Sequence, residues 1–178
     1  MKRVKRVLAL LAAFALVLAM AVPAWAEGNK GNITVQNAKE NEEYKIYRIF
    51  DLESYSENSY SYKMSEKWSK AGFATNSVFK EYFEIVNGYI KPKAEFTDEA
   101  AATFAKNALA FAKEKKIEDD GHQTAGKTGV SFSNLSLGYY LLDTSLGTLC
   151  SLDTTNPAAI LREKNDSPTI EKKVKEND

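Results

Sequence analysis

Apolar residues recur along most of the chain with the two-residue period of β-strands, while one later region follows the 3.6-residue period of an α-helix. The two-residue stretches are rich in Val, Ile, Tyr and Phe and are bounded by Gly, Asn, Ser and Pro, a pattern typical of strands joined by turns. Strands are predicted at 32–37, at 43–54, at 60–64 after a turn at 57–58, on both sides of 87–88, on both sides of a turn at 134–138, at 148–153 and at 158–163.

The sharpest turn signal is Asn87-Gly88, which separates two short strand-like runs. Both residue types tolerate a positive φ, and a type I′ hairpin turn requires a positive φ at both of its central positions. We therefore predict a tight β-hairpin centred on this pair.

The helical period begins after Thr97. Thr97 is a suitable N-cap, and Asp98 and Glu99 place negative charge in the first turn, where the helix dipole favours it. One stripe of this helix is apolar, which predicts packing against a sheet rather than a cofactor site. The stripe consists of Ala101, Phe104, Ala108, Phe111 and Ala112.

Residues 66–71 predict a short helix anchored by Trp68, and residues 118–129 predict a polar loop. The order of elements lacks the regular alternation of strand and helix that builds a parallel sheet. The predicted fold class is therefore mainly β: an immunoglobulin-like antiparallel β-sandwich with an inserted α-helix at about 98–116 and the short helix near 66–71.

The first 26 residues have the pattern of a secretory signal peptide: a basic start, an apolar run and a small-x-small cleavage site that ends at Ala26. The alternative is a membrane anchor, but the apolar run is short for a span of about 20 residues. Without this segment 20 basic and 24 acidic residues remain, a net charge of −4. This balance lacks the basic stripe of a nucleic-acid-binding protein.

The expected exported chain is long enough for one domain with a hydrophobic core. Its single cysteine, Cys150, cannot form an internal disulfide, so stability must come from packing or from another covalent link. Cys150 lies in an apolar strand-like run, which favours a buried apolar role over a reactive thiol.

Catalytic patterns are weak in this sequence. His122 stands in the polar loop beside Asp119 and Asp120, and a secreted hydrolase would need it in a cleft beside a nucleophile. Gly121–Thr128 fits the phosphate-loop pattern, but that loop joins a strand to a helix, and here a charged run precedes and a strand-like run follows. The ligand spacings of zinc and calcium sites are absent. We expect no cofactor, no metal and no catalytic residue.

A lysine side chain near the end of the sequence could form a covalent cross-link. In the closing run Thr169–Val174, the two-residue period places Lys172 on one face with Ile170 and Val174. A lysine held in an apolar core loses its charge, and its neutral amine can attack a neighbouring Asn side chain with release of ammonia. The alternative, which the residues alone favour, is a charged tail.

Several segments in a fixed order resemble the first domain of backbone pilins that class C sortases assemble in Gram-positive bacteria. The resemblance covers Gly31 to Asp178, and it rests on EYKIYRIFDLE, FAKNALAFAK, SFSNLSLGYYLLDTS, LCSLDTTNPAAILREKN and SPTIEKKVKEND. It implies an N-terminal pilin domain at 31–165 after the signal peptide at 1–26. Residues 166–178 would be a linker and the first strand of a truncated following domain.

The resemblance implies that a sortase joins the C-terminal motif of one subunit to a lysine of the next. In the family this lysine lies in a motif resembling Tyr-Pro-Lys-Asn at the junction of two domains. The matching place here is REKN, with Lys164 as the acceptor and Asn165 after it. Arg162 and Glu163 stand where the motif has Tyr and Pro, which departs from the family pattern.

The following domain of such pilins is typically of the collagen-adhesin B type, with an internal Lys–Asn isopeptide bond, and Lys172 matches its lysine. The Asn partner would lie beyond Asp178. Some first domains also form such a bond through an Asn next to the pilin lysine. Asn165 matches that Asn, but the strand at 32–37 offers Gln36 rather than a lysine.

The implied function is structural: a subunit of a covalently polymerised cell-surface pilus that supports adhesion, and not an enzyme. The implied location is the cell wall or pilus after secretion, and the partners are other pilin subunits, a class C sortase and a host surface ligand, with no nucleic acid. The alternative is a minor or basal pilin, or a surface adhesin module that binds a host protein or glycan. Exposed aromatic side chains over one groove would favour the adhesin, and Tyr55, Tyr60 and Tyr62 leave that alternative open.

Overall fold

The computed structural model describes residues 30–56, 59–94, 96–144, 147–154 and 156–162. The strands are β1 (Lys30–Gln36), β2 (Glu43–Ser56), β3 (Ser59–Met64), β4 (Phe83–Val86), β5 (Tyr89–Pro92), β6 (Gly121–Thr124), β7 (Val130–Ser136), β8 (Gly138–Leu142), β9 (Thr148–Leu152) and β10 (Ala158–Arg162). The helices are α2 (Glu66–Lys70), the 3-10 helix η1 (Phe73–Thr75), α3 (Ser77–Tyr82) and α4 (Asp98–Lys115).

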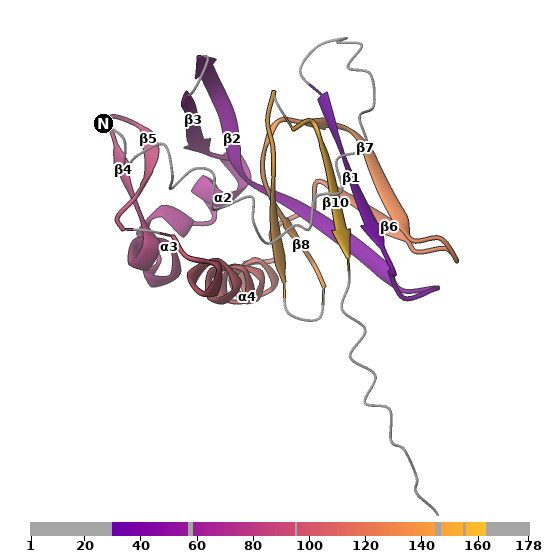
Figure 1. Cartoon of the computed structure of the whole chain (residues 1–178). Coiled ribbons are helices and arrows are strands. Elements are labelled where there is room, and N and C mark those ends of the chain that lie inside the picture. The colour runs from indigo at the N-terminus through magenta and orange to yellow at the C-terminus, as the bar shows by residue number, and fades with distance from the viewer. Residues whose placement is uncertain (1–29, 57–58, 95, 145–146, 155, 163–178) are drawn as a thin grey trace, which may run out of the picture.

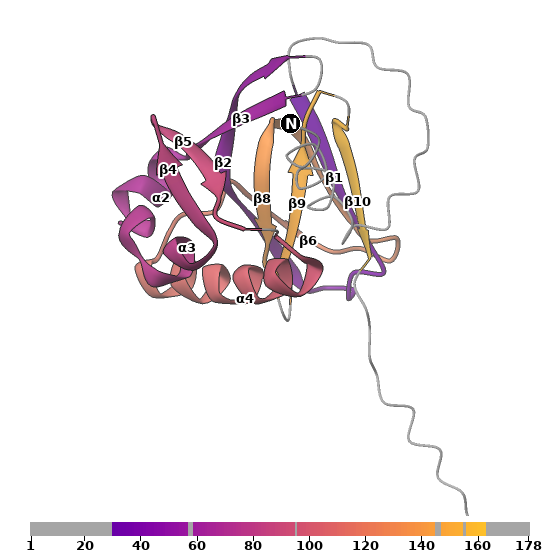
Figure 2. The ribbon, with the colours of Figure 1, turned by 60° about the vertical axis from the view of Figure 1, so that its left-hand side comes forward.

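Three layers build the molecule (Figures 1 and 2). A smaller sheet in the order β10-β1-β7 packs against a larger sheet in the order β3-β2-β8-β9, in which β6 also pairs with β2. The helices and the β4-β5 hairpin cover the other face of the larger sheet. The predicted mainly β sandwich with an inserted helix is confirmed, with the difference that β1 and β10 run parallel.

The larger sheet is buried on both faces. All five residues of β8 are buried, because Tyr139 and Leu141 face the helical layer while Tyr140 and Leu142 face the smaller sheet. A strand buried on both sides reads as a continuous apolar run, which explains why GYYLL lacks polar alternation. The register of β2 against β8 shifts between Arg48 and Phe50, a β-bulge that breaks the regular alternation of faces in β2.

The helical layer forms as its sequence predicts. Helix α4 begins after Thr97, whose hydroxyl accepts a hydrogen bond from the Ala100 N–H at 3.2 Å. The predicted apolar stripe is buried. Trp68 of α2 is 0% exposed, and its ring lies 4.7 Å from that of Phe73, which in turn lies 4.9 Å from Phe111 of α4. This chain of rings attaches the short helices to α4.

The predicted hairpin is also confirmed. Asn87 has a φ of 52° and Gly88 a φ of 82°, as a type I′ turn requires. The register pairs Phe83 with Pro92 and Ile85 with Ile90. Directly paired residues share a face, so these four form one apolar strip of the hairpin.

Two predictions in the second half of the chain are wrong. Residues 118–129 are not a loop throughout, because Gly121–Thr124 form β6 and pair with β2. The predicted turn does not span 134–138, because β7 continues to Ser136 and β8 begins at Gly138. β7 pairs with β1, whereas β8 pairs with β2 and β9. The chain instead crosses between sheets at Leu137, and a Cβ at Gly138 would lie 2.2 Å from the Phe50 carbonyl oxygen. Only glycine fits this crossing.

Candidate functional site at the end of β10

Strand β10 closes the described part of the sandwich. Ala159 and Leu161 are buried in the core between the two sheets, whereas Ala158 and Ile160 are half-buried and Arg162 is exposed. β10 runs parallel to β1, from the pair Asn32–Ala158 to the pair Gln36–Arg162. The last strand therefore lies beside the first strand over its whole length.

Both ends of β10 are held by hydrogen bonds to β1. The Asn32 N–H donates to the Pro157 carbonyl at 2.8 Å, just before β10 begins. At the other end, Arg162 Nε donates to Gln36 Oε1 at 3.1 Å. The position of β10 as far as Arg162 is therefore fixed by the first strand.

The predicted site residues Lys164, Asn165 and Lys172, and the cleavage residue Ala26, lie outside the described residues. The structure does place Gln36 of β1, which the sequence analysis named as standing where a lysine would be needed for a bond to Asn165. It faces Arg162 and accepts a hydrogen bond from it.

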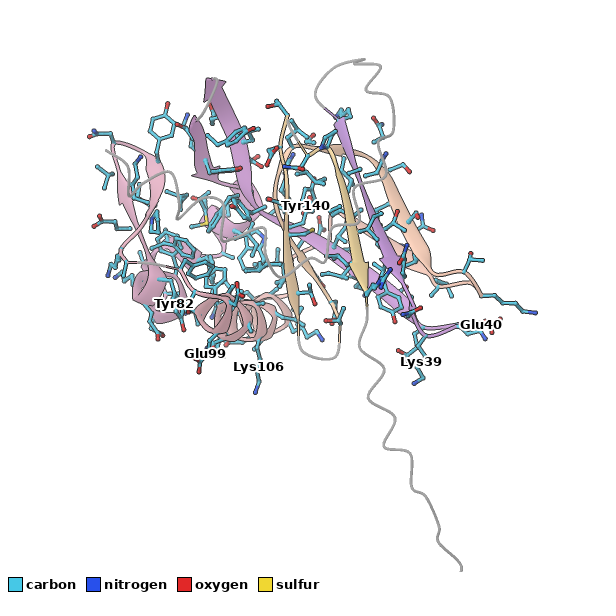
Figure 3. The ribbon with its side chains drawn as sticks, in the orientation of Figure 1. Lys39, Glu40, Tyr82, Glu99, Lys106 and Tyr140 are labelled. Atoms are coloured by element: carbon cyan, nitrogen blue, oxygen red, sulfur yellow. The ribbon has the colours of Figure 1, made fainter. Side chains whose placement is uncertain are left out.

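A charged turn adjoins the end of β10. Residues 37–42 follow Gln36, and Asn37 and Asn41 in this turn have φ angles of 57° and 67°. Lys39 Nζ lies 2.5 Å from Glu42 Oε1, and the Lys39 N–H donates to the Tyr44 hydroxyl at 2.9 Å. Figure 3 shows Lys39 and Glu40 projecting from this end of the molecule. Lys39 therefore offers a matched control for any claim about a nearby lysine.

His122 does not lie in a cleft. It stands on β6, its side chain is 63% exposed, and its Nδ1 lies 3.1 Å from Asp119 Oδ1. The neighbouring Asp120 is engaged elsewhere: its carboxylate accepts from the Arg48 N–H at 2.6 Å and from Lys67 Nζ at 3.0 Å. Among the residues that the structure describes, His122 hydrogen-bonds to Asp119 on an exposed strand and is not paired with a nucleophile.

The phosphate-loop pattern at 121–128 has the wrong structure around it. The segment begins as strand β6, turns through the bridge between Gly126 and Gly129, and continues into strand β7. A Cβ at Gly129 would lie 2.2 Å from the Val35 carbonyl oxygen, so this glycine serves close backbone packing on β1. The context that a phosphate loop requires is a following helix.

Cys150 has the buried role that its sequence context predicts. It is 3% exposed in the core between the sheets, and burial raises the pKa of its thiol to about 12. A thiol with this pKa stays protonated at neutral pH, and the thiolate is the reactive form. Cys150 therefore acts as a small apolar core residue.

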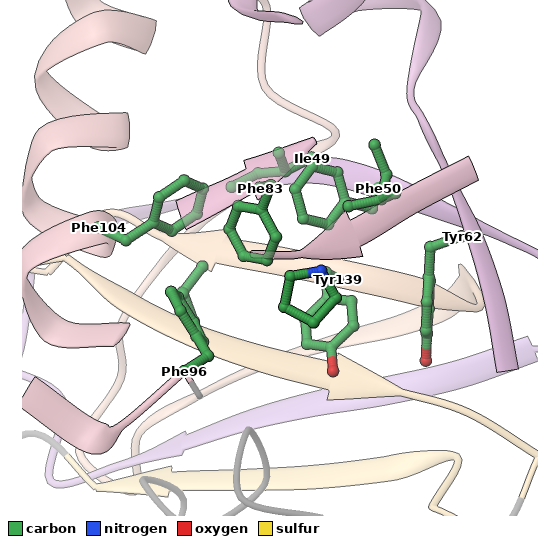
Figure 4. A pocket seen from close by; sticks show the side chains of 10 residues that line it. Ile49, Phe50, Tyr62, Phe83, Phe96, Phe104 and Tyr139 are labelled. Atoms are coloured by element: carbon green, nitrogen blue, oxygen red, sulfur yellow. The ribbon is translucent and has the colours of Figure 1, made fainter. Parts of the chain in front are cut away.

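An apolar cavity of about 40 Å³ lies between the larger sheet and the helical layer, and the sequence analysis missed it (Figure 4). Aromatic residues are concentrated between 73 and 104, but this pattern is equally typical of a closely packed core without a cavity. The lining residues are Ile49, Phe50, Tyr62, Phe83, Ile90, Pro92, Phe96, Phe104, Tyr139 and Leu149.

The chain matches no protein-family model, and the comparison with curated proteins finds no match. Across the described ranges, no helix combines the length and the apolar character needed to cross a membrane.

Proposed function

We propose that this protein is a structural subunit of a covalently polymerised cell-surface pilus and that a class C sortase attaches the preceding subunit to Lys164. The observation that carries the proposal is the fixed end of β10. The strand is tied to β1 through Gln36 and Arg162, and Lys164 follows two residues later. An acceptor two residues after such a strand end in the sequence suits attachment to a neighbouring subunit.

The proposed chemistry suits such a position. A sortase holds the cleaved C-terminal motif of one subunit as a thioester on its cysteine. The deprotonated Nζ of Lys164 attacks the thioester carbonyl, an amide bond forms, and the cysteine thiolate leaves and takes up the proton released by the amine. The attacking amine must reach into another protein, so it needs an exposed anchor, and Arg162 at the end of β10 is exposed.

The remaining parts of the proposal concern the segments on either side of the sandwich. We assign residues 1–26 as a cleaved signal peptide, place the mature protein in the cell wall or pilus, and assign Lys172 to an isopeptide bond with an Asn of a following domain. The loss of one ammonia makes a longer form of the protein about 17 Da lighter for each such bond. A Lys172→Ala variant would restore the unmodified mass, and an unshifted mass of the unsubstituted protein would reject the bond.

A surface adhesin module is the second candidate, and the apolar cavity is the observation that favours it. Tyr62 lines this cavity and is buried, whereas Tyr60 is half-buried, with its hydroxyl 3.4 Å from Thr154 Oγ1. The side chain of Tyr55 lies outside the described residues. Tyr60 and Tyr62 therefore contribute to packing, and a binding role would belong to the cavity itself.

The pilus proposal is tested in a Gram-positive host that expresses the protein with its sortase. Lys164→Ala should abolish the high-molecular-weight ladder of cell-wall extracts on denaturing gels. Lys39→Ala and Lys106→Ala, both exposed in the structure, should leave the ladder unchanged. A ladder that persists in the Lys164→Ala variant would refute the assignment of the acceptor.

A further inference from the structure

The β4-β5 hairpin forms a sheet of its own at one side of the molecule (Figure 1). Within the described ranges, β4 and β5 pair with each other and with no other strand. At the base, the Lys93 N–H donates to the Tyr82 carbonyl at 2.9 Å, a bond between the two flanks of the hairpin itself. Toward β3, the Lys63 ammonium group lies 5.3 Å from the centre of the Tyr89 ring. Side-chain packing, and not a backbone ladder, therefore holds the hairpin on the larger sheet.

One end of the hairpin is firmly held. Phe83 is 4% exposed, and its ring centre lies 4.9 Å from that of Phe96, 5.1 Å from that of Phe104 and 5.5 Å from that of Phe50. Aromatic pairs at such distances stabilise a structure beyond the burial of their surface. Phe83 is also the residue at which α3 ends and the extended backbone of β4 begins. The hairpin is therefore anchored at its first residue.

Burial falls from this anchor toward the turn. Tyr89 and Ile90 are half-buried, whereas Ile85 and Val86 are 44% and 40% exposed. A Cβ at Gly88 would meet nothing within 4 Å, so the space beside the turn is open. The burial of apolar surface is the main force that holds apolar side chains in place, and little of it acts at this end. The hairpin is therefore fixed at its base and loosely held at its tip.

The apolar cavity lies under the hairpin (Figure 4). Ile90 and Pro92 line it from β5, and Tyr62, Tyr139 and Leu149 line it from the larger sheet. Atoms that border a void have no partner atoms on that side and lose the dispersion contacts that close packing would give them. The contact between the hairpin and the larger sheet is therefore weakened where it would otherwise hold the middle of the ribbon.

We propose that the β4-β5 hairpin is a flap that pivots about Phe83, opens while both sheets and α4 stay folded, and controls access to the cavity. A segment with few buried contacts opens locally at a smaller free-energy cost than the whole domain unfolds. Hinges lie at the ends of elements, and Phe83 stands at such an end, between α3 and β4. The inference goes beyond pilus assembly and holds whether or not Lys164 is the acceptor.

The lining of the cavity determines what the open flap admits. Aliphatic and aromatic side chains form the walls, and a water in such a space lacks the hydrogen-bond partners that it needs. The cavity therefore favours a small uncharged molecule without polar groups. Its volume of about 40 Å³ is far below the roughly 150 Å³ of an engineered cavity that binds benzene. A single xenon atom is therefore a more suitable probe than an aromatic ring.

Hydrogen exchange tests the flap directly. In residues 27–178, the chain without its expected signal peptide, the amides of the β4-β5 ladder should exchange at least about 100-fold faster than those of β8. Their exchange should also depend little on low concentrations of urea, because opening the flap exposes little surface compared with global unfolding. Xenon should shift the NMR signals of the methyl groups of Ile90 and Leu149, which stand on opposite walls of the cavity.

Two substitutions change the cavity in opposite directions. Leu149→Phe fills it from β9, outside the flap, and should slow the exchange of the ladder at least about 5-fold and abolish the xenon shifts. Ile90→Ala enlarges it and should speed the exchange at least about 10-fold. Ile160→Phe, at a half-buried position of β10 on the smaller sheet, is the matched control and should change neither. A ribbon that exchanges fast only because it is exposed would not respond to a side chain on β9.

Circular dichroism and the exchange of the β8 amides establish first that each variant is folded. The proposal is overturned if the ladder exchanges at the rate and with the urea dependence of β8, or if xenon does not shift the signals of Ile90 and Leu149. Equal ladder exchange in Leu149→Phe and Ile90→Ala would likewise overturn it. If Leu149→Phe does not fold, Ile90→Ala and Ile160→Phe decide the question, and equal ladder exchange in those two variants refutes the flap.

Discussion

Arg162 and Gln36 join the last described strand to the first one in two ways. They are register partners in the parallel pair of β10 and β1, and Arg162 Nε donates a hydrogen bond to Gln36 Oε1 at 3.1 Å. Parallel strands at the two ends of a domain require a long connection, which here is the whole sandwich and its helical layer. The pair therefore couples the exit of the chain to the earliest strand of the domain.

A Gln36→Ala variant should loosen this exit without unfolding the domain. The hydrogen bond is exposed, so its loss should lower the free energy of unfolding by less than about 1 kcal/mol. Amide hydrogen exchange at Leu161 should become several-fold faster because the end of β10 frays. Gln123→Ala, an exposed glutamine on β6, is the matched control. Equal exchange at Leu161 in both variants would show that the pair does not hold the strand.

The crossing between the sheets should be intolerant of any side chain. Gly138→Ala would bring a Cβ to 2.2 Å from the Phe50 carbonyl oxygen, a backbone atom in the middle of β2. We expect a loss of at least about 3 kcal/mol in urea unfolding, because β8 cannot move without breaking its pairing on both sides. Gly88→Ala provides the contrast: its Cβ meets nothing within 4 Å, so only the cost of a φ of 82° remains, about 1 kcal/mol. Similar losses in the two variants would contradict this account of the crossing.

Asp120 should matter more than its surface position indicates. It accepts hydrogen bonds from the Arg48 N–H and from Lys67 Nζ, and so ties β2 and α2 to the segment before β6. Asp120→Ala leaves a backbone donor unpaired and should cost about 1–3 kcal/mol in thermal or urea unfolding. Glu66→Ala removes an exposed pair with Lys70 and should change stability by less than about 0.5 kcal/mol. The reverse order of these two effects would argue against the bridging role.

Stability should fall at alkaline pH partly through Cys150. Burial raises the pKa of its thiol from 9.0 to about 12. Below pH 9 the thiol is protonated in both states and adds no pH dependence. Between pH 9 and 12 it ionises mainly in the unfolded state, so the free energy of unfolding falls as the pH rises through this window. Burial also raises the pKa of Tyr62, Tyr139 and Tyr140, which steepens the decline.

A Cys150→Ala variant isolates the thiol. Urea unfolding between pH 8 and 11 should show a shallower decline for this variant than for the unsubstituted protein, although its stability at pH 8 is lower because a buried side chain has been shortened. Parallel declines of the two proteins would show that the thiol does not keep its proton in the folded state.

Much of the fold could be predicted because local signals and tertiary packing agree. Thr97 and the Ala and Phe stripe define α4, and Asn87-Gly88 defines the hairpin, since each signal acts within a few residues. The sequence could not reveal that β7 and β8 belong to different sheets, because both carry apolar faces and pairing partners are chosen across the whole chain. Strand β6 was not predicted because GHQT is largely exposed and has no apolar alternation. Its backbone pairing with β2 makes it a strand.

Two features of the candidate site could not be predicted from the sequence. The role of Gln36 as the partner at the end of β10 could not be predicted from spacing, because it depends on a parallel pair between strands more than 120 residues apart. The cavity that Leu149 helps to line could not be predicted for a related reason. Its lining comes from the larger sheet, the β4-β5 hairpin, Phe96 and α4, and a gap between aromatic rings leaves no trace in the order of the residues.

The most direct measurement of the central claim is to map the branch point by mass spectrometry. Residues 27–178 are incubated with the class C sortase and a labelled peptide that carries its sorting motif, and the cross-linked product is digested and sequenced. The account predicts one modified residue, Lys164, and loss of the product in Lys164→Ala with full retention in Lys39→Ala and Lys172→Ala. Modification of Lys172 or Lys39 in place of Lys164, or unchanged product in Lys164→Ala, would contradict it.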